Sequence, residues 1–137
     1  MIERNRSLAR RWFEEVWNRR LAATVDELLA PEAVGHMEGV EVVGPTVFHK
    51  VRSALLVAFP DLQITVEDTV AEGDNVVLRW RATGTHLGEG FGIRATRTAI
   101  DFRGMTWHRI VGGRIVEGWD AWNQGALIER LRAATGE

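Results

Sequence analysis

Residues 117–125 read EGWDAWNQG and place one carboxylate, Asp120, between Trp119 and Trp122. A buried, ionised Asp is costly unless it is paired, and in apolar surroundings it tends to hold a proton. Free Asp, with a pKa of ~3.9, is too weak a base to take a proton from carbon, whereas burial against apolar rings raises that pKa. The stretch therefore predicts a tuned general acid/base or ligand contact. The alternative is a carboxylate that caps the next helix or binds a backbone amide.

The four histidines are the other candidates for proton transfer or ligand binding. His36 ends a predicted strand, His86 lies in the loop sequence GTHLGEG, and His108 lies on a predicted strand, whereas His49 is expected on a helix surface. Three His and an Asp could bind a metal, but no His-x-His or Glu-x-x-His spacing occurs, so we expect no metal. The structural alternatives are a loop residue that bonds to backbone for His86 and a satisfied core histidine for His108.

Composition limits the classes of protein and of chemistry. The 137 residues suit a single domain, 1–137, and the chain is 45% apolar and 26% charged with a net charge of −2. That balance predicts neither a nucleic-acid partner nor a membrane surface. The lack of Cys excludes disulfides and thiolate chemistry. No apolar run approaches the ~20 residues that span a bilayer, and the charged N-terminus lacks a signal-peptide core, so we expect a cytoplasmic protein.

The first part of the chain predicts helices around one short strand. Apolar residues recur with helical spacing over residues 3–20. A second helix is expected from Thr24, which begins a capping-box pattern, and a third from an N-cap at Thr46 to about Phe59. Residues 33–43 predict a short strand and a turn.

The second part predicts an antiparallel meander and a short helix from about Gln124. The four expected strands are residues 62–70, 76–83, 97–111 and 114–122. Helices that precede a run of strands indicate an α+β fold, with the helices on one face of the sheet.

The Gly112-Gly113 turn decides which residues share a face with Asp120. A three-residue loop with a bulge at Gly113 would place His108 opposite Val116, Thr106 opposite Gly118, and Gly104 opposite Asp120. In that register one face is nearly apolar apart from Asp120 and His108, and the other is charged. Register is strongly specified when one face is buried. We therefore predict that Asp120, His108, Thr106 and Trp122 point inward, and that Gly104 and Gly118 leave a cavity beside the carboxylate.

Two further aromatic residues are candidates for the walls of this cavity. Trp80 alternates with Arg79 and Arg81, so it faces inward as core or as a stacking wall for a planar ligand. The Gly-rich stretch 88–92 has no Lys-Ser/Thr helix after it, which excludes a phosphate loop. It predicts instead a mobile rim on which Phe91 covers the cavity mouth.

Four stretches together resemble one family. They are LAPEAVGH (29–36), AFPDLQITVED (58–68), AEGDNVVLRWRATGTHLGEGFGI (71–93) and FRGMTWHRIVGGRIVEGWD (102–120). Over residues 8–131 the chain is similar to the SnoaL-like polyketide cyclases, or ester cyclases, of the nuclear transport factor 2-like superfamily.

The resemblance implies a cone-shaped α+β barrel, in which a curved antiparallel sheet wraps three N-terminal helices and encloses a deep pocket. It implies a homodimer or tetramer joined through the outer sheet face. It also implies an intramolecular aldol closure of a polyketide ester, without metal or cofactor, in which the family's acid/base Asp matches Asp120. Three positions depart from the family. The chain has Thr106 where the family has a His, Arg94-Ala95-Thr96-Arg97 where the family has Pro-Pro-Thr-Gly, and Asn123 where the family often has a second carboxylate.

The sequence thus predicts a cyclase, or a related lyase or isomerase, acting on a hydrophobic, carbonyl-bearing small molecule, with Asp120 catalytic. The expected substrate-binding residues are His36, His86, His108, Trp80, Phe91, Thr106 and Trp122. Two alternatives remain, because a fold does not fix a function. One is a non-catalytic binding or dimerisation module. The other is an epoxide hydrolase, which needs an Asp-Arg-Asp network, whereas the predicted pocket face offers one Asp and no Arg.

Overall fold

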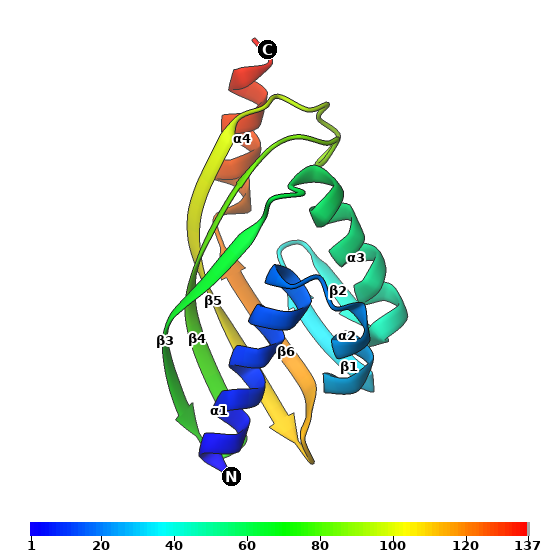
Figure 1. Ribbon diagram of the computed structural model, residues 1–137, viewed down its shortest axis with the longest axis vertical. Coiled ribbons are helices and arrows are strands. Elements are labelled where there is room, and N and C mark those ends of the chain that lie inside the picture. Colours follow the sequence, from blue (N-terminus) through cyan, green and yellow to red (C-terminus); the bar gives the residue numbers. More distant parts are fainter. Residues whose placement is uncertain (137) are drawn as a thin grey trace.

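A curved sheet forms one wall of the protein, and most of the helices lie against its concave face (Figure 1). The computed structural model describes residues 1–136. The helical elements are α1 (Ile2–Arg11), η1 (Trp12–Asn18), α2 (Ala22–Leu28), α3 (Gly44–Ala58) and α4 (Gln124–Ala134). The strands are β1 (Leu29–Met37), β2 (Val40–Val43), β3 (Gln63–Glu72), β4 (Asn75–Thr85), β5 (Ala99–Val111) and β6 (Arg114–Trp122). The predicted α+β class is confirmed.

The six strands lie in the order β2-β1-β6-β5-β4-β3. Neighbours are antiparallel except β1 and β6, which run parallel. The sheet is therefore mixed, and it curves around the helices without closing. The parallel pair joins the first strand to the last, so the meander of β3 to β6 is anchored to the N-terminal half of the chain. No helix among residues 1–136 is long and apolar enough to cross a bilayer.

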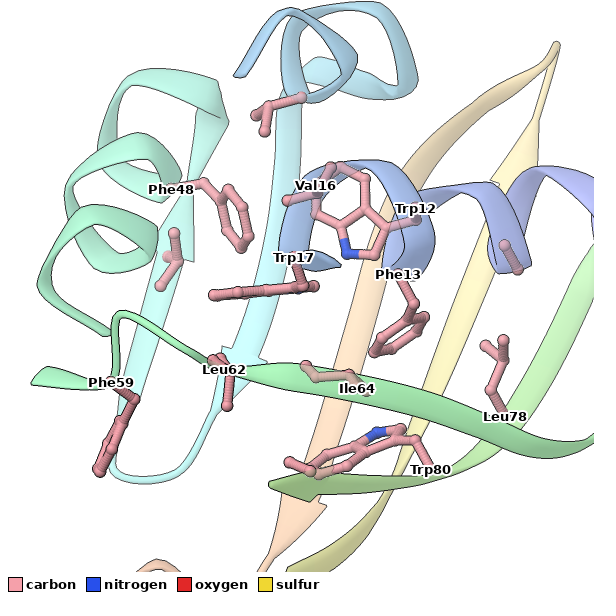
Figure 2. Close-up of a cluster of buried hydrophobic side chains, with 14 of the residues drawn as sticks. Trp12, Phe13, Val16, Trp17, Phe48, Phe59, Leu62, Ile64, Leu78 and Trp80 are labelled. Carbon is pink, nitrogen blue, oxygen red and sulfur yellow. The ribbon is translucent and has the colours of Figure 1, made fainter. Parts of the chain in front are cut away.

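The predicted first helix is two helices, because α1 continues into the π-helix η1. In a π-helix residues five apart align, so Trp12 and Trp17 share one face and both contact Phe48 of α3, with ring centroids 5.0 and 5.9 Å away. Figure 2 shows the rings of η1 lying between Phe48 and Trp80 of β4. The carbonyl of Val16 lies in the last turn of η1, where helical carbonyls lack an intrahelical partner, and it accepts a hydrogen bond from Arg52 Nε at 3.0 Å. The π-turn thus builds an aromatic layer over the sheet.

Both predicted N-caps are wrong. Helix α2 begins at Ala22, so Thr24 lies inside it, and its hydroxyl donates to Glu15 Oε1 at 2.8 Å. Helix α3 begins at Gly44, ahead of Thr46, with a proline in its first turn. The fixed φ of proline suits that position, where its missing N–H has no helical partner. In each case a neighbouring residue starts the helix earlier than the side-chain pattern indicated.

The β5–β6 hairpin has the predicted faces but a different register. Gly112 and Gly113 both have positive φ, 61° and 77°, and form a two-residue turn that pairs Val111 with Arg114. The extra residue is Val116, a bulge inside β6. Relative to the prediction, the pairing beyond the bulge moves by two residues, which keeps the side chains from Glu117 to Trp122 on their expected faces. Before the bulge Ile115 pairs with Ile110 and faces inward, whereas the predicted register would have placed it opposite Arg109. Thr106, not Gly104, therefore lies opposite Asp120.

Candidate active site

A cavity of about 730 Å³ lies between the concave sheet face, η1, α3 and the loop of residues 86–98. This volume is in the range of small-molecule sites. Its walls are mainly aromatic and aliphatic, and in the described part of the chain the ionisable lining residues are Glu38, Glu89, His108 and Asp120. No Arg or Lys of residues 1–136 lines it. The cavity therefore suits an apolar molecule without a negative charge at its buried end.

Asp120 reaches this cavity from β6 and is held by a chain of two hydrogen bonds, one buried and one partly buried. Thr106 Oγ1 donates to Asp120 Oδ1 at 2.5 Å, and Trp80 Nε1 donates to Thr106 Oγ1 at 2.9 Å. A threonine hydroxyl has one proton. Because Thr106 accepts from the indole, its own proton is directed to the carboxylate. One oxygen of Asp120 is thereby fixed, and the other, which has no hydrogen-bond partner among residues 1–136, is open to a ligand.

Burial raises the pKa of Asp120 to about 6. The hydrogen bond from Thr106 lowers the pKa, because it stabilises the ionised form, and the negative charge of Glu38 raises it. The side chain is half-buried, and it lines the cavity. A carboxyl with a pKa near neutrality can accept a proton in one step and return it in the next.

Of the two glycines that were expected to leave space beside Asp120, Gly118 lines the cavity as predicted, whereas Gly104 is covered by the Trp80 ring. A Cβ on Gly104 would come within 2.5 Å of the Trp80 indole, and one on Gly118 within 3.1 Å of His108 Cδ2. Gly104 therefore lets Trp80 cross β5 and reach Thr106. The cavity extends from Gly118 and these rings to α3.

His108 lies on the inner face and is 5% exposed. Burial lowers its pKa to about 4, so the ring is neutral at physiological pH. It stacks on Phe13 with ring centroids 6.2 Å apart, and its Nδ1 is buried without a partner among residues 1–136. A buried N–H without an acceptor is rare in proteins. We therefore expect the proton on Nε2, near Gly118 and the cavity.

Trp122 and Phe91 also line the cavity, as predicted for both. Trp122 stacks on Phe102 with centroids 4.7 Å apart. Phe91 lies on a tight turn with an unusual positive φ of 56°. The loop that carries it is tied to α3 by bonds from the N–H groups of Leu87 and Gly88 to the carbonyl of Ala58. Contacts with ligand stay a prediction for all of these residues.

His36 does not line the cavity, which corrects the expectation from its strand. It lies on the outer sheet face, where Nε2 is 2.8 Å from Glu117 Oε2, Nδ1 is 2.9 Å from Glu41 Oε2, and the ring stacks on Trp119. The bond to Glu117 raises the pKa of His36. The sequence does not show on which face of the sheet each side chain of β1 lies, because this depends on pairing with β6, which is distant in sequence.

His86 is also outside the lining, although it is fully buried. Its Nδ1 accepts from the backbone N–H of Thr96 at 3.2 Å, and its backbone bonds to Arg97 and Thr98. The structural alternative, a histidine that organises the loop, describes it better than substrate contact.

Two polar residues at the cavity end of β6 have roles that the sequence did not reveal. Asn123, which stands for a second family carboxylate, caps α4 by accepting from Ala126 N–H at 2.9 Å. Glu38 lies on the β1–β2 turn and lines the cavity. Its sequence signal is only that of an exposed turn residue. No group of three potential metal ligands forms within residues 1–136.

Replacing Thr106 by Val should raise the pKa of Asp120 further, because the hydroxyl that stabilises the carboxylate is lost. Thr106→Ser keeps the hydroxyl and should leave the pKa near that of the wild type. Carboxyl ¹³C chemical shifts followed against pH would measure both. Equal pKa values in the two variants would show that the hydroxyl does not tune Asp120.

Comparison with known proteins decides the family. The model of the SnoaL-like polyketide cyclases matches residues 7–131. The chain belongs to this family. No curated protein matches this SnoaL-like chain.

Solved structures agree with that family. A SnoaL-like candidate polyketide cyclase from Jannaschia sp. CCS1 superimposes with a TM-score of 0.91 at 24% identity, covering 96% of this chain and 94% of the other. AclR, a candidate hydroxylase from Streptomyces galilaeus, superimposes with a TM-score of 0.85 at 32% identity, covering 97% of this chain and 83% of the other. IdmH, a candidate polyketide cyclase from Streptomyces antibioticus, superimposes with a TM-score of 0.78 at 28% identity, covering 97% of this chain and 99% of the other. The first comparison bears on the fold alone.

Proposed function

We propose that this SnoaL-like protein is a cyclase, or a related lyase or isomerase, that uses Asp120 as its general acid/base on a hydrophobic carbonyl compound. The observation that carries the proposal is a carboxyl with a pKa of about 6 that faces an apolar cavity. The hydrogen bond from Thr106 fixes one oxygen and leaves the other for the substrate.

The proposed reaction is an aldol closure of a polyketide ester. The free oxygen of Asp120 removes a proton from the carbon next to a carbonyl, and the C–H electrons form an enolate. The enolate carbon then attacks a second carbonyl of the same molecule, which forms a C–C bond and an alkoxide. Protonated Asp120 returns the proton to that alkoxide, so the carboxylate is regenerated and no redox partner is used.

His108 is the best-placed residue to stabilise the enolate oxygen. A neutral imidazole with its proton on Nε2 donates a hydrogen bond without transferring the proton. Such a hydrogen bond stabilises a negative oxygen more strongly in a site that excludes water. His108 lies opposite Gly118, one inward position along from the Thr106–Asp120 pair. Both groups therefore reach the same part of the cavity from adjacent strands.

Incubation with a linear or partly cyclised polyketide methyl ester, followed by mass spectrometry and chromatography, tests the proposal. An aldol closure changes retention but conserves mass, and we expect such a product. The 32% identity to AclR supports hydroxylation as a second candidate. With O₂ and a two-electron reductant supplied, that reaction would add one oxygen atom to the substrate, release the other as water, and raise the product mass by one oxygen atom. If every carbonyl compound tested binds to the protein but is recovered unchanged, the result would favour a non-catalytic binding module. An epoxide hydrolase is disfavoured, because no Arg among the described residues lines the cavity.

We also propose that the outer sheet face joins two copies of the chain. Met105, Trp107 and Trp119 are 52%, 47% and 38% exposed there, on the two central strands. Clustered exposed aromatic residues are typical of protein interfaces.

Trp107→Lys should convert a dimer into a monomer in sedimentation-velocity experiments, because it removes an exposed indole from the proposed contact and adds a charge that the partner copy would have to desolvate. Val47→Lys, on exposed α3, is the matched control and should leave the assembly unchanged. A wild-type monomer at high concentration, or a Trp107→Lys dimer, would contradict this interface.

A further inference from the structure

Glu38 lies where the β1–β2 turn meets the far end of β6. The turn consists of Glu38 and Gly39, and Gly39 takes the positive φ, 75°, that such a turn requires. Glu38 is exposed to solvent but also lines the cavity that contains Asp120. Its Oε1 accepts from the backbone N–H of Trp122 at 3.3 Å.

This bond compensates for a strand that ends early. β1 pairs with β6 only as far as the pair His36–Trp119, after which β1 turns away into β2. β6 continues through Trp122, so the segment that contains Asp120 pairs with β5 on one side and with no strand of residues 1–136 on the other. The Glu38 carboxylate supplies the acceptor that a strand carbonyl would otherwise provide for Trp122 N–H.

We infer that Glu38 is a positioning residue for Asp120: it fixes the end of β6 by its bond to Trp122 and places a second negative charge on the cavity that Asp120 faces. The inference rests on the proposed acid/base role of Asp120.

The charges around Asp120 favour such an effect. From β5, Thr106 donates to Asp120 and the neutral ring of His108 lines the same cavity. The loop of residues 86–98 adds Glu89 to the cavity lining, and α4 adds the uncharged Gln124. No cation of residues 1–136 lines the cavity to cancel a carboxylate. Two like charges that share such a site disfavour ionisation of the more buried one. The charge of Glu38 accordingly adds to burial in raising the pKa of Asp120.

Two substitutions separate the two parts of this role. Glu38→Gln keeps a side-chain oxygen that can accept from Trp122 N–H and removes the charge, whereas Glu38→Ala removes both. We expect Glu38→Gln to lower the pKa of Asp120 by about half a unit or more, as expected for charges in a partly solvated site. Glu38→Ala should lower it as well, and should also speed hydrogen exchange of the Trp122 amide at least tenfold.

Carboxyl ¹³C titration and amide exchange by NMR measure these effects on the free protein, and the pH profile of turnover gives a second readout. Glu41→Gln is the matched control, because Glu41 is a carboxylate of the same hairpin that contacts His36 on the outer face. It should leave the titration of Asp120 unchanged.

An unchanged titration of Asp120 in Glu38→Gln would overturn the inference, as would unchanged exchange of the Trp122 amide in Glu38→Ala. Neither result depends on turnover. If Asp120→Asn proved fully active, the proposed function would fail while the NMR measurements still tested Glu38. If Asp120→Asn were inactive and Glu38→Gln left the titration unchanged, only the role of Glu38 would fail.

Discussion

Asp120→Asn is expected to reduce turnover by a factor of about 10²–10⁴ while leaving ligand affinity nearly unchanged. The amide is isosteric, and its oxygen can still accept from Thr106, so the cavity and the bond from Trp80 are retained. It cannot accept the substrate proton or return it to the alkoxide. A loss of kcat with little change in binding is the pattern of an interaction made only in the transition state.

The measurement pairs product formation with binding. Quenching of tryptophan fluorescence should report the Kd, because Trp80 and Trp122 line the cavity. Asp101→Asn is a matched control on the same sheet, since Asp101 lies on the outer face of β5 and pairs with Arg81 at 2.5 Å. Full activity in Asp120→Asn would remove Asp120 from the mechanism, and equal losses in both variants would indicate a general effect on folding.

The same substitution should make the protein more stable at pH 8, by about 1–3 kcal/mol. Burial raises the pKa of Asp120 from 3.8 to about 6, so ionising it above that pH costs folding free energy. The upper limit is the full shift of about two pKa units at 1.36 kcal/mol each. The lower limit of this gain in stability allows for screening of the carboxylate by water in the cavity. Asn carries no charge and avoids this cost.

The sign of the pH dependence follows from proton binding. Between pH 3.8 and about 6 the folded state binds more protons at Asp120 than the unfolded state, so its contribution to the free energy of unfolding falls as pH rises. Below about pH 4 both states hold the proton, and the variant and the wild type should converge. Above about pH 6 the difference should be constant.

His108 acts in the opposite sense over nearly the same interval. Its pKa is lowered to about 4, so between pH 4 and 6.5 the unfolded chain binds the extra proton and its contribution to stability rises with pH. The two groups therefore partly cancel in the wild type, and Asp120→Asn should reveal a steeper rise. Urea unfolding at a series of pH values measures this. A pH-independent difference between the variant and the wild type would mean that Asp120 is not destabilised by burial.

The inner placement of Asp120 could be predicted from the sequence because side chains alternate strictly along a strand. Of the two possible ways to align β5 with β6, an even or an odd offset, only one puts the apolar residues on one face and the charged residues on the other. The actual register differs from the predicted one by two residues, so beyond the bulge this alignment of faces is kept. The same alternation placed Trp80, Thr106, His108 and Trp122 on the inner face. Apolar patterning therefore determined the composition of the cavity wall.

The hydrogen-bonded partner of Asp120 depended on a local event that alternation cannot detect. A bulge at Val116, rather than in the turn, moved Thr106 opposite the carboxylate, and Gly104 admitted the Trp80 ring that orients the hydroxyl. From Glu117 to Trp122 both bulge positions put the same side chains on each face, so alternation in that segment does not distinguish them. The signal that could have distinguished them is Ile115, an apolar residue that faces inward only in the actual register.

The sequence by itself determined the family, the α+β class and an acid on the apolar face, because these follow from local periodicity and recurring motifs. Only the tertiary structure decided which polar groups surround that acid. The parallel pairing of β1 with β6 joins residues about 80 positions apart. It sent His36 to the outer face and brought Glu38 to the cavity. Such long-range pairing depends on how all the layers pack together, and no short stretch of sequence specifies it.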